Sequence, residues 1–416
     1  MGAMPVTVRG VFRPDRWSDQ LRMSFLWFAG NAIWAPMISV ILPFLVLRDV
    51  GNAEKDLALS LVTTLGAIVA SLAHPFGGWA SDRTRTAWGR RRPYLIGGGC
   101  VSAIALGLLT FHDGFVELVI AVLILQLAYN VLLAAYQAYI PEIAPESSRG
   151  RASGFLGLMS ALGSLFGLLG AIALLHNATY GWLLLLLAAL LLGACAVTVW
   201  GVPEGAIIEP PVHTGERLTL SAIKSRYRDF GWVLLTRALV MLAFYTLLYY
   251  LAYDLRDVVH VVHYTTTTSE VEAVTIVVAA LCSVWSGTLS DRIGRKGLVS
   301  FSGVAMALAA LAFVAARSVP VVLAVGVLFG IGYGVYISVD WALITDVLPD
   351  QSVIARDMGI WGLAITVPQA LTGVLGGIVF LLFPGGGPRA YVVLFSLTCV
   401  YAGLGSVLVW RVRGVR

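Results

Sequence analysis

Aromatic and amide side chains stand at helical spacing in the first apolar segment of the chain. Trp27, Asn31 and Trp34 occupy positions i, i+4 and i+7, which lie on one face of a helix. Two indole rings with an amide between them could stack on a sugar ring and hydrogen-bond its hydroxyl groups. The alternative is that the tryptophans face lipid and that the Asn31 amide joins two helices. Both alternatives require the three side chains to lie on one apolar helix.

Further amide and tyrosine side chains share helical faces in three later segments. Amides inside an apolar helix are costly unless they meet partners or water, and a path for a polar solute supplies water. The alternative is that these side chains pack or hydrogen-bond between helices. We predict that they line a solute site, and the candidates are Gln126, Asn130, Tyr245, Tyr333 and Tyr336.

Asp340 is the acidic residue best placed for proton transfer. It lies about two helical turns inside an apolar segment and shares a helical face with Tyr333 and Tyr336. Ionisable residues in hydrocarbon are expensive and usually functional. We therefore predict that Asp340 carries a proton. The alternative is a permanent ion pair with Arg237.

The composition indicates which elements hold these residues. Of the 416 residues, 58% are hydrophobic and only 12% are charged, and the mean hydropathy is +0.85. A soluble domain is about 25% charged, so this chain lacks the polar coat of a soluble enzyme. A β-barrel would show short alternating segments instead of long apolar runs. We expect an all-α polytopic membrane protein.

Twelve apolar runs are long enough to span a bilayer as helices. They cover residues 21–47, 57–80, 93–112, 117–140, 152–175, 180–202, 230–252, 271–290, 297–316, 319–346, 357–383 and 390–410. Of the 28 Lys and Arg residues, 22 then lie on the side of the termini and five on the other. This bias predicts a multi-pass protein of the inner (plasma) membrane with both termini in the cytoplasm. The basic residues form no contiguous patch, so we expect no nucleic-acid partner.

The chain repeats itself at about half its length. The motif Gly-x-x-x-Asp-Arg at residues 78–83 recurs at residues 287–292. Glu142 and Asp346 also correspond, at the ends of the fourth and tenth runs, where we predict gating or capping roles. Two-lobed membrane proteins of this kind are secondary transporters, which bind solute between the lobes. The repeat predicts two six-helix bundles and a cytoplasmic linker, namely residues 1–202, 229–416 and, between them, 203–228.

A resemblance to a known family lies in the loop after the second run. Residues 78–93 read Gly-Trp-Ala-Ser-Asp-Arg-Thr-Arg-Thr-Ala-Trp-Gly-Arg-Arg-Arg-Pro. This sequence resembles the signature of the major facilitator superfamily, and residues 287–296 resemble its second-half copy. The Gly-Arg-Arg-Arg-Pro ending and the segment Asp340–Pro349 are similar to the glycoside–pentoside–hexuronide:cation symporters and the sucrose-type transporters. The resemblance implies the major facilitator fold.

The resemblance also implies that the charged residues of these loops act as gates. A carboxylate beside guanidinium groups can form charge-assisted pairs in one arrangement of the lobes and lose them in the other. The alternative is that these charges only set the topology. The residues given a gating role are Asp82, Arg83, Arg90, Arg91, Asp291, Arg292 and Arg295.

The sequence holds no nucleotide-binding loop, dinucleotide fingerprint, metal-ligand cluster or nucleophile elbow. We therefore expect no enzyme activity, cofactor or metal, and transport energy must come from a gradient. The expected function is proton-coupled symport of a sugar or similar small polar solute by alternating access, carried out by a monomer in the lipid bilayer. The alternative is export of an amphipathic drug-like or lipid compound, because the candidate site is aromatic and poor in charge.

Overall fold

The computed structural model describes residues 16–137, 149–176, 178–203, 227–347, 354–383 and 387–413. Within these ranges the chain is helical, and the β-type pairing in them is an isolated bridge between Thr86 and Gly89. A helix satisfies its own backbone hydrogen bonds, which is what an apolar surrounding demands of a spanning segment. The expectation of an all-α polytopic membrane protein is confirmed.

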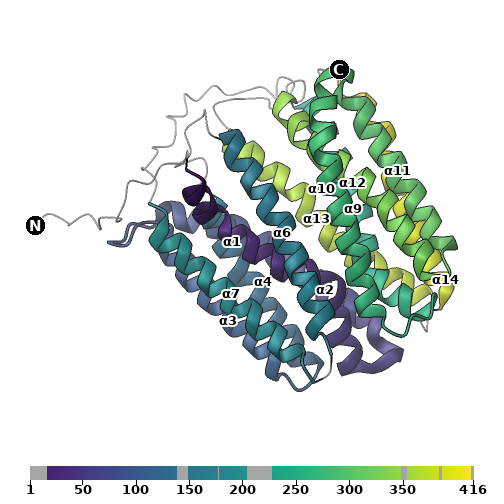
Figure 1. Ribbon diagram of the computed structural model, residues 1–416, viewed down its shortest axis with the longest axis horizontal. Coiled ribbons are helices and arrows are strands. Elements are labelled where there is room, and N and C mark those ends of the chain that lie inside the picture. The colour runs from purple at the N-terminus through teal and green to yellow at the C-terminus, as the bar shows by residue number, and fades with distance from the viewer. Residues whose placement is uncertain are drawn as a thin grey trace, which may run out of the picture. The chain divides into compact units, whose positions relative to one another are not determined.

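The chain divides into two compact units, each with its own helices (Figure 1). Unit 1 takes its described residues from Met1–Met37, Arg48–Val50 and Leu65–Glu209, and unit 2 takes them from Ile38–Leu47, Gly51–Thr64 and Pro210–Arg416. Unit 2 thus contains two short segments from the first half of the sequence. The division into bundles at residues 202 and 229 stays a prediction.

Unit 1 is built from helices of the first half of the chain. They are α1 (Trp17–Pro36), the later part of α2 (Leu42–Arg83), α3 (Arg92–Phe111), α4 (Phe115–Gln137), α6 (Arg149–Leu174) and α7 (Tyr180–Gly201).

Unit 2 combines the second half of the chain with the π-helical turn after α1 and the start of α2. Its elements are η1 (Met37–Ile41, from Ile38 on), the early part of α2, α9 (Arg228–Asp257), α10 (Tyr264–Ile293), α11 (Arg295–Ala315), α12 (Val319–Val347), α13 (Ile354–Leu382), α14 (Pro388–Leu408) and the 3-10 turn η4 (Val409–Arg411).

Eleven helical segments among the described residues are long and apolar enough to cross a membrane. The first covers Trp17–Arg83, which at 67 residues is far longer than one crossing requires. Gly51 interrupts it with a φ of 73°, a left-handed conformation that glycine adopts without strain. With Gly51 between two crossings, the eleven segments account closely for the twelve predicted runs.

One predicted boundary differs markedly from the structure. The eighth run was expected to begin at residue 271, but α10 begins at Tyr264. Thr265–Thr268 have low hydropathy, yet they suit a helix because a threonine hydroxyl can bond to the backbone of its own helix. Thr268 donates such a hydrogen bond to the Tyr264 carbonyl over 2.7 Å. The earlier start places Glu272 two turns inside the helix rather than at its end.

Helices α1 and α6 pack with their backbones in direct contact. A Cβ atom at Gly163 would lie 2.2 Å from the Phe28 carbonyl oxygen, and one at Gly167 would lie 2.1 Å from the Ala32 carbonyl oxygen. Small residues permit this close approach of membrane helices. The packing fixes the face of α1 that carries the candidate site residues.

We expect Gly167→Ala to lower the melting temperature of the detergent-solubilised protein, because the added methyl group collides with backbone at Ala32. Overpacking of this kind costs about 1–3 kcal/mol. Gly157→Ala is the matched control on the same helix, since nothing lies within 4 Å of a Cβ there. Intrinsic tryptophan fluorescence on heating measures both variants. Equal melting temperatures would contradict the proposed packing.

Candidate functional site

The aromatic face predicted on α1 packs against α4 within unit 1. Trp27 stacks on Tyr136 with ring centroids 6.2 Å apart, and Trp34 meets Tyr129 edge-on at 5.5 Å. The Tyr129 hydroxyl lies so close to Gly30 that a side chain there would collide with it. The structure therefore brings both predicted tryptophans together with tyrosines of α4.

Asn31 makes one hydrogen bond within its helix and one to a neighbouring helix. Its Nδ2 donates to the Trp27 carbonyl over 2.8 Å, and its Oδ1 accepts a hydrogen bond from the Ser160 hydroxyl over 2.9 Å. Ser160 lies on α6, so Asn31 links α1 to α6. This is the interhelical bond expected under the alternative to solute binding. The two roles are compatible, because the Asn31 side chain is only half-buried.

The amides predicted on α4 pair with each other. Asn130 Nδ2 donates to the Gln126 carbonyl over 2.8 Å and to the Gln126 side-chain oxygen over 3.1 Å. The Gln126 amide also lies against Gly66 of α2. The two side chains thus form one polar strip on the surface of α4.

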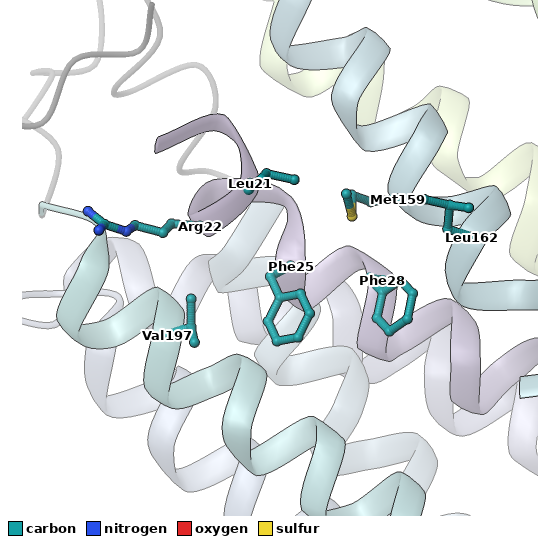
Figure 2. Close-up of a pocket in the computed structure, with 7 residues that line it drawn as sticks. All are labelled: Leu21, Arg22, Phe25, Phe28, Met159, Leu162 and Val197. Atoms are coloured by element: carbon teal, nitrogen blue, oxygen red, sulfur yellow. The ribbon is translucent and has the colours of Figure 1, made fainter. Parts of the chain in front are cut away.

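A pocket of about 360 Å³ lies on unit 1 among α1, α6 and α7 (Figure 2). Apart from Arg22, whose side chain extends away from the others in Figure 2, the lining residues are apolar: Leu21, Phe25, Phe28, Met159, Leu162 and Val197. The predicted solute-binding residues do not line it. Such a wall suits hydrocarbon better than a hydroxylated solute, whose hydroxyl groups would lose their hydrogen bonds.

The other predicted solute-binding residues lie in unit 2, where α9 contacts both α12 and α13. Phe244 of α9 stacks on Tyr333 of α12 with centroids 4.3 Å apart and planes 12° from parallel. Tyr245 lies edge-on to Phe244 at 5.4 Å. We call the group to which these rings belong the unit 2 cluster, and its members are Arg237, Phe244, Tyr245, Tyr333, Tyr336, Asp340 and Trp361.

An ion pair joins α9 to α12 inside the unit 2 cluster. Arg237 Nη1 contacts Asp340 Oδ2, and the Tyr336 hydroxyl donates a hydrogen bond of 2.9 Å to the other carboxylate oxygen. The Arg237 guanidinium also lies 3.7 Å from the centre of the Trp361 ring, a cation–π distance. All four side chains are buried. Asp340 therefore forms the ion pair with Arg237 that was the alternative to a proton-carrying role.

The unit 2 cluster combines the two kinds of contact by which proteins bind sugars. Aromatic faces can stack on the apolar face of a ring. A buried charge pair and tyrosine hydroxyl groups can exchange hydrogen bonds with solute hydroxyls. Among the described residues, no group of three His, Cys, Asp or Glu side chains could hold a metal ion.

The first of the two loop motifs forms the ion pair that a gate would use. Arg91 Nη2 lies 2.5 Å from Asp82 Oδ1, with the Arg91 side chain 4% exposed and the Asp82 side chain 60% exposed. Arg91 also donates a hydrogen bond to the Ser81 hydroxyl. Arg83 lies over the ring of Trp79 at 4.2 Å, and Arg90 is buried. The loop therefore holds a buried guanidinium against a carboxylate that reaches solvent.

The second copy of the motif is described only in part. Arg295 is half-buried at the start of α11, directly after Gly294, whose φ of 92° turns the chain between α10 and α11. The backbones of Asp291, Arg292 and Asp346 are helical, but their side chains lie outside the described part of the structure. Glu142 also lies outside the described residues. Their gating roles stay predictions.

A buried charge cluster that the sequence reasoning missed lies at the predicted extracytoplasmic end of unit 2. We call it the Lys55 cluster, and it consists of Lys55, Asp56, Asp257 and Tyr391. Lys55 Nζ donates to Asp56 Oδ1 over 2.9 Å and to Asp257 Oδ2 over 2.5 Å. The Tyr391 hydroxyl lies 3.1 Å and 2.8 Å from the same two oxygens. The cluster ties the start of α2 to the end of α9 and the start of α14.

A buried carboxyl group lies at the same end. Ser39, in the π-helical turn η1, donates a hydrogen bond of 2.6 Å to Glu272 Oε2 of α10. Glu272 is 7% exposed, and its Oε1 has no hydrogen-bond partner among the described residues. Glu272 was not singled out because the predicted run begins at residue 271 and places it at a helix end, whereas α10 begins at Tyr264. Lys55 was not singled out because it lies between two predicted membrane runs, where a charged residue is expected.

The comparisons with known proteins agree on the superfamily. Residues 31–409 match the family described as MFS/sugar transport protein. An uncharacterized MFS-type transporter of Methanocaldococcus jannaschii is 21% identical over 85% of this chain and 86% of its own length. The lactose permease of Lactobacillus delbrueckii subsp. bulgaricus is 29% identical over 32% of this chain and 24% of the permease. An uncharacterized symporter of Synechocystis is 32% identical over 34% of this chain and 28% of that protein.

Solved transporter structures share the fold at low sequence identity. A peptide transporter, POT, superposes with a TM-score of 0.77 at 14% identity, covering 97% of this chain and 95% of that one. The nucleoside transporter NupG superposes with a TM-score of 0.72 at 12% identity, covering 94% and 99%. The predicted resemblance to the major facilitator superfamily is confirmed, and because the family match spans most of the sequence, the chain belongs to the MFS/sugar transport protein family.

Proposed function

We propose that this protein is a secondary active transporter that couples uptake of a sugar or similar small polar solute to the entry of protons. It works by alternating access as a monomer in the plasma membrane, with both termini in the cytoplasm. Membership of the MFS/sugar transport protein family supports the class of solute. The charge bias of the loops supports the orientation.

The observation that carries the proposal is the unit 2 cluster. Stacked Phe244 and Tyr333 offer aromatic faces, and the pair of Arg237 and Asp340 offers charged hydrogen-bonding groups beside them. Ionisable residues at membrane depth are expensive and mark solute or ion pathways. The solute contacts proposed on unit 1 are Trp27, Asn31, Trp34, Gln126 and Asn130.

The Lys55 cluster is the proposed extracytoplasmic gate, and it is closed here. Lys55 is 1% exposed, so its charge depends on Asp56 and Asp257 for compensation. Lys55 and Asp56 belong to the first half of the sequence, whereas Asp257 and Tyr391 belong to the second. An opening motion that draws the start of α2 away from the end of α9 and the start of α14 would separate these partners and let water replace them.

Close backbone packing accompanies this closure. A Cβ atom at Gly373 of α13 would lie 2.3 Å from the Thr64 hydroxyl and 3.0 Å from the Ser60 carbonyl oxygen. The Ser60 hydroxyl also lies 2.9 Å from that of Tyr250 on α9. Small side chains on both surfaces allow the helices to meet and part without leaving interlocked side chains. The packing of α13 against the start of α2 therefore supports a contact that can open and close rather than a permanent one.

Export of an amphipathic or lipid compound is the second candidate function, and the apolar pocket in Figure 2 favours it. Proteoliposomes loaded at neutral pH and diluted into acidic buffer distinguish the two functions. We expect accumulation of a radiolabelled sugar from a panel that includes lactose and sucrose, and its abolition by a protonophore. Accumulation of no sugar, combined with proton-driven movement of a fluorescent amphiphile, would replace the proposal with the second candidate.

Substitution of Asp340 separates its two expected roles. Asp340→Asn leaves Arg237 buried without its counter-ion, which typically costs about 3–5 kcal/mol. We therefore expect the single variant to lose thermal stability and the double variant with Arg237→Gln to recover it. Fluorescence-detected unfolding in detergent measures both. A stable Asp340→Asn protein that exchanges sugar but no longer accumulates it would instead identify Asp340 as the proton carrier.

Asp82→Asn tests the cytoplasmic gate. Loss of the pair with Arg91 should shift the balance between the two lobe arrangements by about 1–3 kcal/mol, so we expect at least a fivefold fall in uptake rate with little change in solute affinity. Asp113→Asn, which alters an exposed carboxylate in the loop between α3 and α4, is the control. Unchanged uptake by Asp82→Asn would leave these charges with a role in topology alone.

A further inference from the structure

Glu272 differs from three neighbouring acidic groups at the predicted extracytoplasmic end in the partner it has. Asp56 and Asp257 face the Lys55 ammonium, and Asp49 faces His112 at 3.0 Å. The hydrogen bond described for Glu272 comes from an uncharged group, the Ser39 hydroxyl. Its second oxygen is buried and unpartnered among the described residues.

The two forms of this carboxyl group differ greatly in the cost of burial. A charged carboxylate away from water is far more expensive to bury than a neutral acid unless a cation or several donors compensate it. One serine hydroxyl is a weak compensation for a full charge. A neutral acid leaves at most one polar atom unsatisfied, which is a smaller penalty. The surroundings of Glu272 therefore suit its protonated form.

The partner of Glu272 comes from an irregular turn of the first membrane segment. Ser39 lies in η1, where the helix widens to a π-helical turn directly after Pro36. Such turns are rare and frequently mark functional sites. The neighbouring segment is held to α9 at the same end, since the Tyr253 hydroxyl donates to the Pro43 carbonyl over 2.9 Å. The contact of Ser39 with Glu272 thus joins η1 to α10 beside a second bond between the same segment and α9.

We propose that Glu272 links closure of the extracytoplasmic end to the uptake of one proton. When this end is open, the Glu272 carboxylate meets water and takes a proton from the outside solution onto a carboxylate oxygen. When it closes, the neutral acid is buried and the Ser39 hydroxyl donates to it. Ser39 is a positioning residue in this scheme. The inference rests on the proposed function, because it supplies the step at which a proton enters the cycle.

Other ionisable groups at the same end of unit 2 could also respond to pH and must be distinguished from Glu272. Helix α9 carries Asp254, Arg256 and Asp257 towards its end, and α10 itself carries Glu270. Further groups at this end are His260, His263, Tyr264, Arg317 and the remaining members of the Lys55 cluster. The segment 38–47, which supplies Ser39, contains no charged residue.

Distance measurements between two spin labels test the linkage without any solute. The labels replace Ala53 and Val262, both exposed, in a protein whose four cysteines have been substituted. We expect the closed fraction to rise as the pH falls, with the ratio of closed to open protein changing by up to about tenfold per pH unit for a single linked proton. Glu272→Gln should be closed to the same extent at every pH, because its amide is neutral throughout.

Glu270→Gln is the matched control, since it removes an exposed carboxylate from the same helix two residues away. It should titrate like the unsubstituted protein. A pH response that survives Glu272→Gln would assign the titration to other groups, such as His260, His263 or Asp257, and would overturn the proposal. A pH-independent unsubstituted protein would overturn it as well.

Two further outcomes keep the test decisive. If Glu272→Gln does not fold, Ser39→Ala takes its place, and we expect a smaller closed fraction at low pH; an unchanged titration would contradict the linkage. Because the labels report closure and not transport, failure to accumulate sugar would refute the proposed function while leaving this measurement intact. Proton-driven accumulation that is normal in Glu272→Gln would refute the inference while leaving the proposed function intact.

Discussion

The cost of holding a charge away from water governs the arrangement of polar groups in this protein. An isolated ion in a medium of low dielectric loses several kcal/mol of hydration even after the protein relaxes around it. Arg237 meets that cost with Asp340 and the face of Trp361. Lys55 meets it with two carboxylates and the ring of Tyr253, 4.2 Å away. Because pairing is obligatory, each motion that separates such partners must offer them water or another partner in return.

The same cost bears on the two gates proposed for this protein. Asp82 reaches solvent while its partner Arg91 is buried. If the pair separates, Asp82 can therefore be hydrated at once, whereas Arg91 cannot. In the Lys55 cluster, Lys55 and Asp56 are buried and Asp257 is partly exposed. Separation of the Lys55 cluster thus requires water to enter, whereas Asp82 already contacts solvent. The two proposed gates therefore differ in how much water must enter before they can open.

The helical pattern could be predicted from the sequence because insertion of a helix into a bilayer depends on the hydrophobicity of about 20 consecutive residues. That quantity can be summed directly from the sequence. The sets Trp27–Asn31–Trp34 and Tyr333–Tyr336–Asp340 followed from periodicity alone. Arg237 was foreseen as the alternative partner of Asp340, because few charged groups lie inside the apolar runs. The contact of Asn31 with Ser160 could not be predicted, because it joins residues far apart in the sequence. Glu272 escaped notice since its helix begins with threonines, whose hydroxyl groups lower hydropathy without opposing helix formation.

The π-helical turn η1 has a geometric consequence for the first membrane segment. One extra residue in a turn rotates every later side chain by about 100° relative to a regular α-helix. Residues before the turn belong to unit 1, whereas Ile38–Leu47 belong to unit 2. The turn therefore lets one continuous segment present one stripe of side chains along its first part and an independently oriented stripe along its second. Reversion of that single turn to α-helical winding would re-aim the second stripe without disturbing the first.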